Sequence, residues 1–239
     1  MRTVGVPRFT RASSWRRAGS GSAPAGGGPQ VAPTPSTRSP ADPIAGLGLP
    51  LGFPAGVDLF QQGAAPESVF FLVDGLVKLV RIQPNGREAI VGLRPGRAVL
   101  GMASVLADEP YPVSATSVTR CRLVRIEAGL LRRRLREDPE LSLLLHRAQS
   151  AELNELHVRV ADLCSLTAGE RLEQFLGEFL ELLGGDASDG PCRIPLTQSE
   201  IASAVGVSPP YLCRLLHRFA ADGSVRWERN RLVLTRRLR

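Results

Sequence analysis

Short apolar runs separated by glycine turns fill the chain between Pro50 and Ile126. Each run has the length of a β-strand, and the Asp74-Gly75 and Asn85-Gly86 pairs supply the positive φ that tight hairpin turns require. Evenly spaced short strands with glycine turns are typical of an antiparallel barrel or jelly roll. We therefore predict a β-roll over residues 48–135. The expected strands are residues 69–73, 76–82, 89–93, 98–100, 113–118 and 121–126.

A long helix is predicted to follow the β-roll, in a segment that we assign to residues 136–165. After Glu127 the apolar period changes from two to about 3.6, the period of an α-helix. Asp138 followed by Pro139 is typical of a helix cap and a first helical position. Apolar side chains then recur every three or four residues, which predicts a coiled-coil homodimer interface, with packing against the chain's own domain as the alternative. This stripe consists of Leu153, Leu156, Val160 and Leu163.

Two capped helices joined by a glycine turn are predicted near the carboxy-terminal end. Thr197 followed three residues later by Glu200 forms a capping box, which starts a short helix. Gly206 fits the sharp reversal after it, because glycine adopts positive φ without strain. Ser208 then caps a second helix whose first position is Pro209, where the missing N–H costs nothing. This pattern indicates a helix-turn-helix, and an ordinary helical hairpin is the alternative.

The polar side of the second helix is predicted to contact double-stranded DNA. In a helix-turn-helix the first residues of this helix meet base edges in the major groove, and later cations meet phosphates. Arg214 is the candidate base reader, because a guanidinium can bond guanine O6 and N7 together. Residues 225–228 and 232–234 are expected to form a hairpin wing with a basic tip, and for any single residue a solvated face is the alternative. The DNA-binding candidates are Thr197, Gln198, Ser208, Pro210, Tyr211, Arg214, His217, Arg218, Arg229 and Arg231.

Charge supports a polyanionic partner, because it is concentrated at the two ends of the chain. The formal net charge is +7. Residues 196–239 hold eight arginines against three acidic residues, and residues 1–45 hold six arginines against one aspartate. Residues 1–47 are rich in Gly, Pro, Ser and Ala, which predicts a disordered basic tail; an organelle transit peptide and a start codon assigned too early remain open.

The four cysteines stand far apart without a C-x-x-C pair or a signal peptide, which predicts a reduced, cytoplasmic protein. No run approaches the roughly 18 apolar residues of a membrane span, so no membrane association is expected.

These motifs, in this order, resemble the cyclic-AMP receptor protein and fumarate-nitrate regulator (CRP/FNR) family over residues 50–239. The resemblance rests on the Gln62-Gly63 and Asp74-Gly75 turns, the glycines at 96 and 101, the long helix and the helix-turn-helix. It implies an α+β chain: a β-roll sensor, a dimerisation helix and a winged helix-turn-helix over residues 166–239. It also implies a homodimer on palindromic sites and an RNA polymerase contact. A helix-turn-helix used for protein interaction without DNA is the alternative.

The family's cyclic-nucleotide pocket uses Gly-Glu-x-x-x-Leu and Arg-Ser-Ala, in which the Glu bonds the ribose and the Arg pairs with the cyclic phosphate. This chain has uncharged residues at both anchors, and an unpaired buried phosphate is costly, so cyclic AMP is not expected to bind. The effector is then an unrecognised small molecule, a partner protein, or absent. The pocket candidates are Gly101, Met102, Ala103, Val113, Ser114 and Ala115.

Other chemistries of the family are not expected either. An iron–sulfur cluster needs four cysteine ligands, and a haem or metal site in the β-roll needs histidine, whereas all three histidines lie outside it. We therefore expect no metal, no cofactor and no enzymatic activity. The second helix begins with Pro209-Pro210 where the family usually has Arg-Glu, so the preferred DNA sequence should differ from the family's best-known site.

Overall fold

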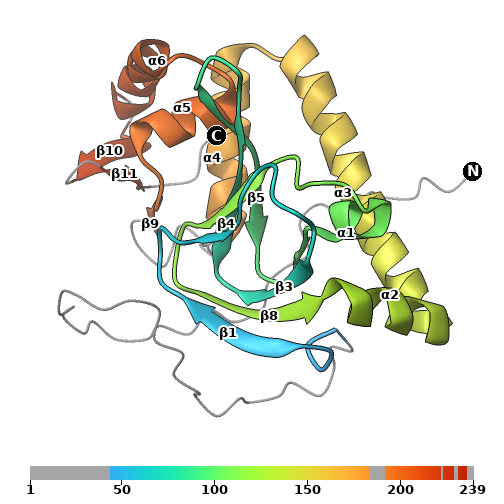
Figure 1. The fold of residues 1–239 in the computed structure, drawn as a ribbon. Helices are drawn as coiled ribbons and strands as arrows, with labels where there is room; N and C mark the ends of the chain where they lie inside the picture. The colour runs from blue at the N-terminus through green and yellow to red at the C-terminus, as the bar shows by residue number, and fades with distance from the viewer. Residues whose placement is uncertain (1–43, 183–191, 222, 229–230, 236–239) are drawn as a thin grey trace, which may run out of the picture. The chain divides into compact units, whose positions relative to one another are not determined.

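The computed structural model describes residues 44–182, 192–221, 223–228 and 231–235 (Figure 1). The described residues form two compact units, one ending at Ser165 and the other beginning at Leu166. The division coincides with the end of the predicted long helix.

The first unit contains two four-stranded antiparallel sheets, which agrees with the predicted α+β class. One sheet has the strand order β1-β8-β3-β6, and the other has the order β2-β7-β4-β5. Most of the strands fall on the predicted runs, whereas β1 and β2 were not predicted. The strands are β1 (Leu49–Phe53), β2 (Asp58–Phe60), β3 (Ser68–Asp74), β4 (Leu76–Ile82), β5 (Glu88–Pro95), β6 (Val99–Leu100), β7 (Ser114–Ser117) and β8 (Cys121–Glu127).

The unbroken apolar run of β3 is explained by burial on both of its faces. Phe70 and Leu72 belong to the cluster that fills the space between the two sheets. Val69 and Phe71 point the other way, into a second cluster shared with the helices. A strand that is covered on both faces has an unbroken run of apolar residues in its sequence, because neither face meets water. Gly75 then joins β3 to β4 at φ +111°, where an added Cβ would lie 2.7 Å from the carbonyl oxygen of Arg120.

Three helices complete the described part of this unit: α1 (Met102–Ala107), α2 (Ala128–Glu137) and α3 (Pro139–Ser165). The predicted start of the long helix is confirmed, since the Asp138 carboxylate accepts a 3.0 Å hydrogen bond from the Leu141 N–H. Leu141 and Leu145 of α3 are buried in the second cluster. α1 was not predicted, and it begins after Gly101 in the left-handed conformation.

Ile44 corrects the predicted boundary of the N-terminal tail. Residues 44–47 were assigned to a disordered segment, but Ile44 is only 5% exposed and belongs to the cluster that holds Leu141 and Leu145. One buried isoleucine among polar and small residues gives no periodic signal, so the sequence pattern missed it. The rest of the predicted tail lies outside the described residues.

Where the structure describes it, the second unit contains three helices and a small antiparallel sheet of order β10-β11-β9. The helix-turn-helix and the wing strands lie where they were predicted, whereas α4 and β9 were not predicted. The core consists mainly of leucine and isoleucine side chains from all three helices. The elements are α4 (Ala168–Leu182), β9 (Cys192–Arg193), α5 (Gln198–Val205), α6 (Pro209–Ala221), β10 (Val225–Glu228) and β11 (Arg231–Leu234).

Candidate nucleic-acid interface

The predicted capping box at the start of α5 is present. The Thr197 hydroxyl accepts a 3.3 Å hydrogen bond from the Glu200 N–H, and the Glu200 carboxylate accepts a 2.7 Å bond from the Thr197 N–H. These reciprocal bonds satisfy backbone N–H groups that a helix start leaves without intrahelical partners. Thr197 remains exposed and Gln198 is half-buried, so both predicted contact residues lie at the surface of the motif.

The turn between α5 and α6 has the predicted geometry, and α4 supports it. Gly206 has φ 76°, and the Val207 N–H donates back to the Ala202 carbonyl at 2.9 Å. Arg171 of α4 donates from Nε to the Val205 carbonyl at 3.0 Å, next to that glycine. Arg171 was not predicted as part of the motif, because its role depends on an α4 helix that was itself missed.

The second helix of the motif divides into a buried side and a polar side, as predicted. Leu212, Leu215 and Leu216 are buried. Ser208 and Pro210 are exposed at its start. The exposed side chains that follow are Tyr211, Arg214, His217 and Arg218.

Tyr211 and Arg214 are in contact on the polar side of α6. The guanidinium carbon of Arg214 lies over the Tyr211 ring, 5.2 Å from its centroid. This distance falls within the range of a cation–π interaction. The candidate base reader therefore has an aromatic neighbour on its own helix.

The wing carries a charge cluster that was not predicted. Glu228 accepts 2.6 Å hydrogen-bonded ion pairs from Arg193 of β9 and Arg226 of β10. The hydrogen bond from Arg193 is the main cause that holds the pKa of the Glu228 carboxyl below its ordinary value. Arg231 is exposed, and its backbone lies opposite Glu228 in the register of β10 and β11. Arg229 lies outside the described residues. The position of Arg193 on β9 gave no sequence signal, because β9 has only two residues.

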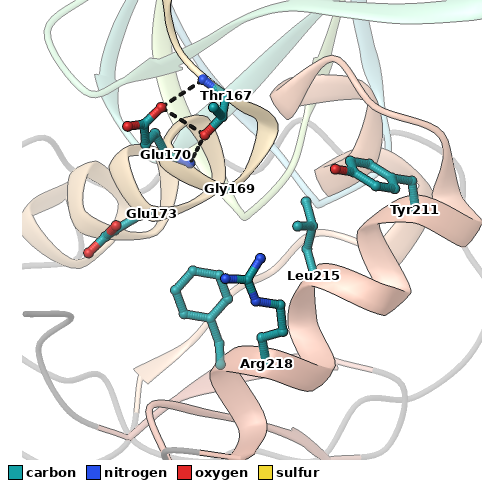
Figure 2. Close-up of a pocket in the computed structure, with 8 residues that line it drawn as sticks. Thr167, Gly169, Glu170, Glu173, Tyr211, Leu215 and Arg218 are labelled. Carbon is teal, nitrogen blue, oxygen red and sulfur yellow. Dashed lines mark hydrogen bonds between the residues drawn. The ribbon is translucent and has the colours of Figure 1, made fainter.

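A groove of about 560 Å³ separates α4 from α6 (Figure 2). Figure 2 shows Glu170 and Glu173 on α4 and Thr167 just before it, with Tyr211, Leu215 and Arg218 on α6. Thr167 and Glu170 form a second capping box, in which the Glu170 carboxylate accepts from the Thr167 N–H at 2.7 Å. Two carboxylates on the α4 wall oppose the entry of a phosphate by like-charge repulsion. We therefore do not take the groove as a phosphate site, although two DNA-binding candidates on α6, Tyr211 and Arg218, also line it.

The six pocket candidates in the β-roll do not form a single side-chain cluster. Met102 is buried in the cluster shared with the helices, whereas Ala115 is buried between the two sheets. The Ser114 hydroxyl accepts a 2.9 Å hydrogen bond from the Gln62 N–H, and Val113 is half-buried. Gly101 precedes α1 in the left-handed region, and Ala103 is exposed on that helix.

A cyclic nucleotide does not fit these residues as the family holds it. Met102 stands where the ribose-binding Glu is expected, and its thioether is buried among apolar side chains. Val113 stands where the phosphate-binding Arg is expected, and it has no charge. Neither side chain can replace the hydrogen bonds and ion pair that a buried cyclic phosphate needs.

The apolar stripe of α3 is exposed to solvent in the single chain. The exposed fractions are 54% for Leu153, 40% for Leu156, 60% for Val160 and 49% for Leu163. In this part of α3 the contacts to the β-roll are polar: Arg94 of β5 binds Glu152 at 2.7 Å, and Arg159 donates to the Ile90 carbonyl at 3.3 Å. The alternative that the stripe packs against its own domain does not match this arrangement.

Within the described residues, no group of three or more His, Cys, Asp or Glu is placed to hold a metal ion. In the same part of the chain, none of the helices combines the length and the apolar character needed to cross a bilayer.

Comparison with known proteins identifies both units. Residues 50–138 match the cyclic nucleotide-binding domain model, and residues 170–239 match the Crp-like helix-turn-helix domain model. The chain is 31% identical to the nitrogen fixation regulation protein FixK of Azorhizobium caulinodans, over 86% of this chain and 82% of that protein. It is 29% identical to a CRP-like cAMP-activated global transcriptional regulator of Mycobacterium tuberculosis, over 78% of this chain and 84% of that protein.

A solved structure has the same fold. The c-di-GMP-responsive global regulator CLP of Xanthomonas campestris aligns with a TM-score of 0.68 at 18% identity, covering 80% of this chain and 95% of that one. At this identity the likeness establishes the fold alone.

Proposed function

The chain belongs to the CRP/FNR family of transcription regulators, and we propose that it binds palindromic DNA as a homodimer through α6 and the wing. The observation that carries this proposal is the capped helix-turn-helix whose second helix exposes Tyr211, Arg214, His217 and Arg218 on one side. Members of this family are regulators rather than enzymes. Because the proposed partner is DNA, we propose that the protein acts in the cytoplasm.

The residues of the motif have different expected roles. Arg214 lies near the start of α6, where side chains of a docked helix reach base edges, so we assign it to guanine recognition. Arg218 lies one turn later and suits a phosphate. Thr197, Gln198 and Ser208 lie at the two helix starts, and Arg231 lies on the wing, where hydrogen bonds to phosphates would fix the orientation of the protein on the duplex.

Homodimerisation is proposed through the exposed stripe of α3. Four large apolar side chains with coiled-coil spacing on one side of a 27-residue helix are costly to leave in water. Pairing two copies of α3 would bury them and hold two motifs for two half-sites. The bound dimer would then act by recruiting or obstructing RNA polymerase.

We propose that any effector is something other than cyclic AMP, since both charged anchors of the family pocket are replaced by Met102 and Val113. The effector differs among the proteins that resemble this chain: one relative is described as cAMP-activated and a structural neighbour as c-di-GMP-responsive. Family membership therefore does not identify the effector of this chain. Action without an effector is the alternative. Thermal-shift measurements of the purified protein with cyclic AMP, and then with other metabolites, distinguish these possibilities.

The proposed DNA binding is tested by a salt series on a duplex selected from a random library. Each phosphate contact adds about −0.9 to the slope of log K against log salt concentration. Arg218→Gln removes one contact from each protomer and should make the slope about 2 less steep. Arg133→Gln, an exposed change on α2 in the other unit, is the matched control and should leave it unchanged. Absent binding, or binding insensitive to salt, would refute the proposal and favour a protein-interaction role for the motif.

A further inference from the structure

Tyr211 and Arg214 form a cation–π pair on the exposed side of α6. They are three residues apart, the spacing that brings side chains of a helix together. The Arg214 guanidinium carbon lies 5.2 Å from the centroid of the Tyr211 ring. The tyrosine is 38% exposed, so the pair lies at the surface that is proposed to meet DNA.

The other neighbours of Arg214 on the helix do not offer an ion pair. α6 contains no Asp or Glu. Arg218, four residues later, has the same charge and repels the guanidinium, while Pro210, four residues earlier, is apolar. The contact that the structure shows for this guanidinium on α6 is with the Tyr211 ring.

Stacking is compatible with base recognition because the two interactions use different parts of the guanidinium. The aromatic ring attracts the cation through the flat face of the guanidinium. The N–H donors lie in the plane of that group and point outward from its edge, where guanine O6 and N7 would accept them. An arginine held over an aromatic ring can thus keep its donors available, and the ring limits the side chain's freedom before DNA binds.

The start of α6 provides a stiff support for this pair. Pro209 and Pro210 precede the tyrosine, and each pyrrolidine ring fixes φ near the helical value. Tyr211 itself loses little rotamer freedom, because its ring turns about only two side-chain angles. The long Arg214 side chain has much more freedom to lose.

We propose that Tyr211 is a positioning residue that holds the Arg214 guanidinium for base recognition, and that it sets DNA specificity through Arg214. This rests on the proposed DNA binding by α6. Tyr211 then contributes little to affinity for unrelated duplex and contributes to the preference for one base pair in each half-site. The hydroxyl of Tyr211 has no part in this role, whereas the aromatic ring is essential.

The test uses two duplexes: the one that the unaltered protein selects, and the same duplex changed at the base pair that Arg214→Ala no longer distinguishes. The discrimination is the ratio of the affinities for these two duplexes. Tyr211→Leu removes the ring and should lower the discrimination about two- to fivefold per half-site, the strength of an exposed cation–π pair. Tyr211→Phe keeps the ring and should retain it. Far-ultraviolet circular dichroism and urea unfolding of both variants should match those of the unaltered protein, which shows that the helix is intact.

A double-mutant cycle separates an indirect role from a direct contact with DNA. At the base pairs of the half-site that the Arg214→Ala protein still discriminates, Tyr211→Leu should cause no loss of discrimination, either alone or in the Arg214→Ala background. A loss at one of these base pairs, with and without Arg214, would overturn the proposal, because Tyr211 would then contact a base itself. Unchanged discrimination in Tyr211→Leu, or a Tyr211→Phe that behaves like Tyr211→Leu, would also overturn it. Failure of the unaltered protein to bind any duplex would instead refute the proposed function.

Discussion

Tyr111 joins the β-roll through both its ring and its hydroxyl. Its ring stacks on Phe60 with centroids 4.1 Å apart, and its Oη donates to the Ser68 carbonyl at 2.5 Å and accepts from the Ser68 N–H at 3.3 Å. Tyr111→Phe should keep the stack but leave both backbone groups of Ser68 without this partner. We expect a loss of about 1–3 kcal/mol in the free energy of unfolding, measured in urea. The control Tyr211→Phe loses an exposed hydroxyl and should change the free energy by less than about 0.5 kcal/mol.

The stabilisation by Tyr111 should depend on pH. Burial is the main cause that raises the pKa of Tyr111 above its ordinary value of 10.0. The unfolded chain therefore loses this proton at a lower pH than the folded chain does. The stabilisation is fully present below about pH 10 and is lost as the pH rises toward the folded pKa. The stability advantage of the unaltered protein over Tyr111→Phe should shrink in that range, and an advantage that is constant up to pH 11 would contradict the assignment.

Single residues also show where sequence reasoning succeeded and where it stopped. The Thr197 and Glu200 capping box predicted α5, and it did so because both partners are close in the chain. Thr167 and Glu170 form the same box at the start of α4 and were overlooked, although the signal was equally local. Ile44 differs from both, because its burial depends on α3 side chains about a hundred residues later, which the sequence pattern does not record.

At the scale of elements, α3 is joined to β5 by a charged contact. Arg94 has a side chain only 10% exposed and binds Glu152 at 2.7 Å, with Glu155 at 3.8 Å. Glu152→Leu should leave the guanidinium without its closest partner. We expect a loss of about 2 kcal/mol in the free energy of unfolding, less than for a fully buried pair because water reaches Glu152. The measurement is urea unfolding followed by far-ultraviolet circular dichroism.

Two further variants distinguish the loss of the Arg94–Glu152 contact from the loss of any nearby negative charge. Glu155→Leu should cost less than about 1 kcal/mol, since Glu155 is more distant and 47% exposed. Arg94→Met combined with Glu152→Met should recover much of the loss, because it leaves no charge without a partner. Equal losses from Glu152→Leu and Glu155→Leu would contradict a specific role for the shorter contact.

The helices of the motif could be predicted more fully than the sheets for a physical reason. Helix ends and turns are set by neighbouring residues, such as Gly206 and Pro209, so their signals are local. Strand pairing joins distant segments: Leu49 lies opposite Arg125, and Ser68 lies opposite Glu127. Runs and turns predicted most of the strands and their antiparallel class. They did not predict β1 or β2, nor that β8 lies between β1 and β3.

At the scale of the whole molecule, the least predictable part is the function of the β-roll. Its fold follows from apolar runs and glycine turns that many sequences share. Its ligand depends on a few side chains, and Met102 and Val113 exclude the family's usual contacts without indicating others. A fold can keep its core while its site changes, because the core and the ligand contacts involve different residues.

Dimerisation through α3 in the first unit should control DNA binding by the second unit. Leu156→Glu places a charge in the centre of the α3 stripe, and pairing two copies would bury two such charges against apolar side chains. We expect a monomer by sedimentation and, with it, a loss of affinity for a two-half-site duplex. The affinity falls because the dimer no longer holds two motifs about one helical turn of DNA apart. Urea unfolding of the variant should stay cooperative, since Leu156 is 40% exposed in the single chain.

Val158→Glu is the matched control on the same helix. Val158 is also a large apolar side chain, 51% exposed, but two residues from Leu156 it lies roughly on the opposite side of α3. It should remain dimeric and bind DNA normally, because its charge stays in water when the stripe is paired. If both variants dissociate, the interface is wider than the stripe. If Leu156→Glu stays dimeric, or binds its site as a monomer with full affinity, the stripe does not hold the two motifs together.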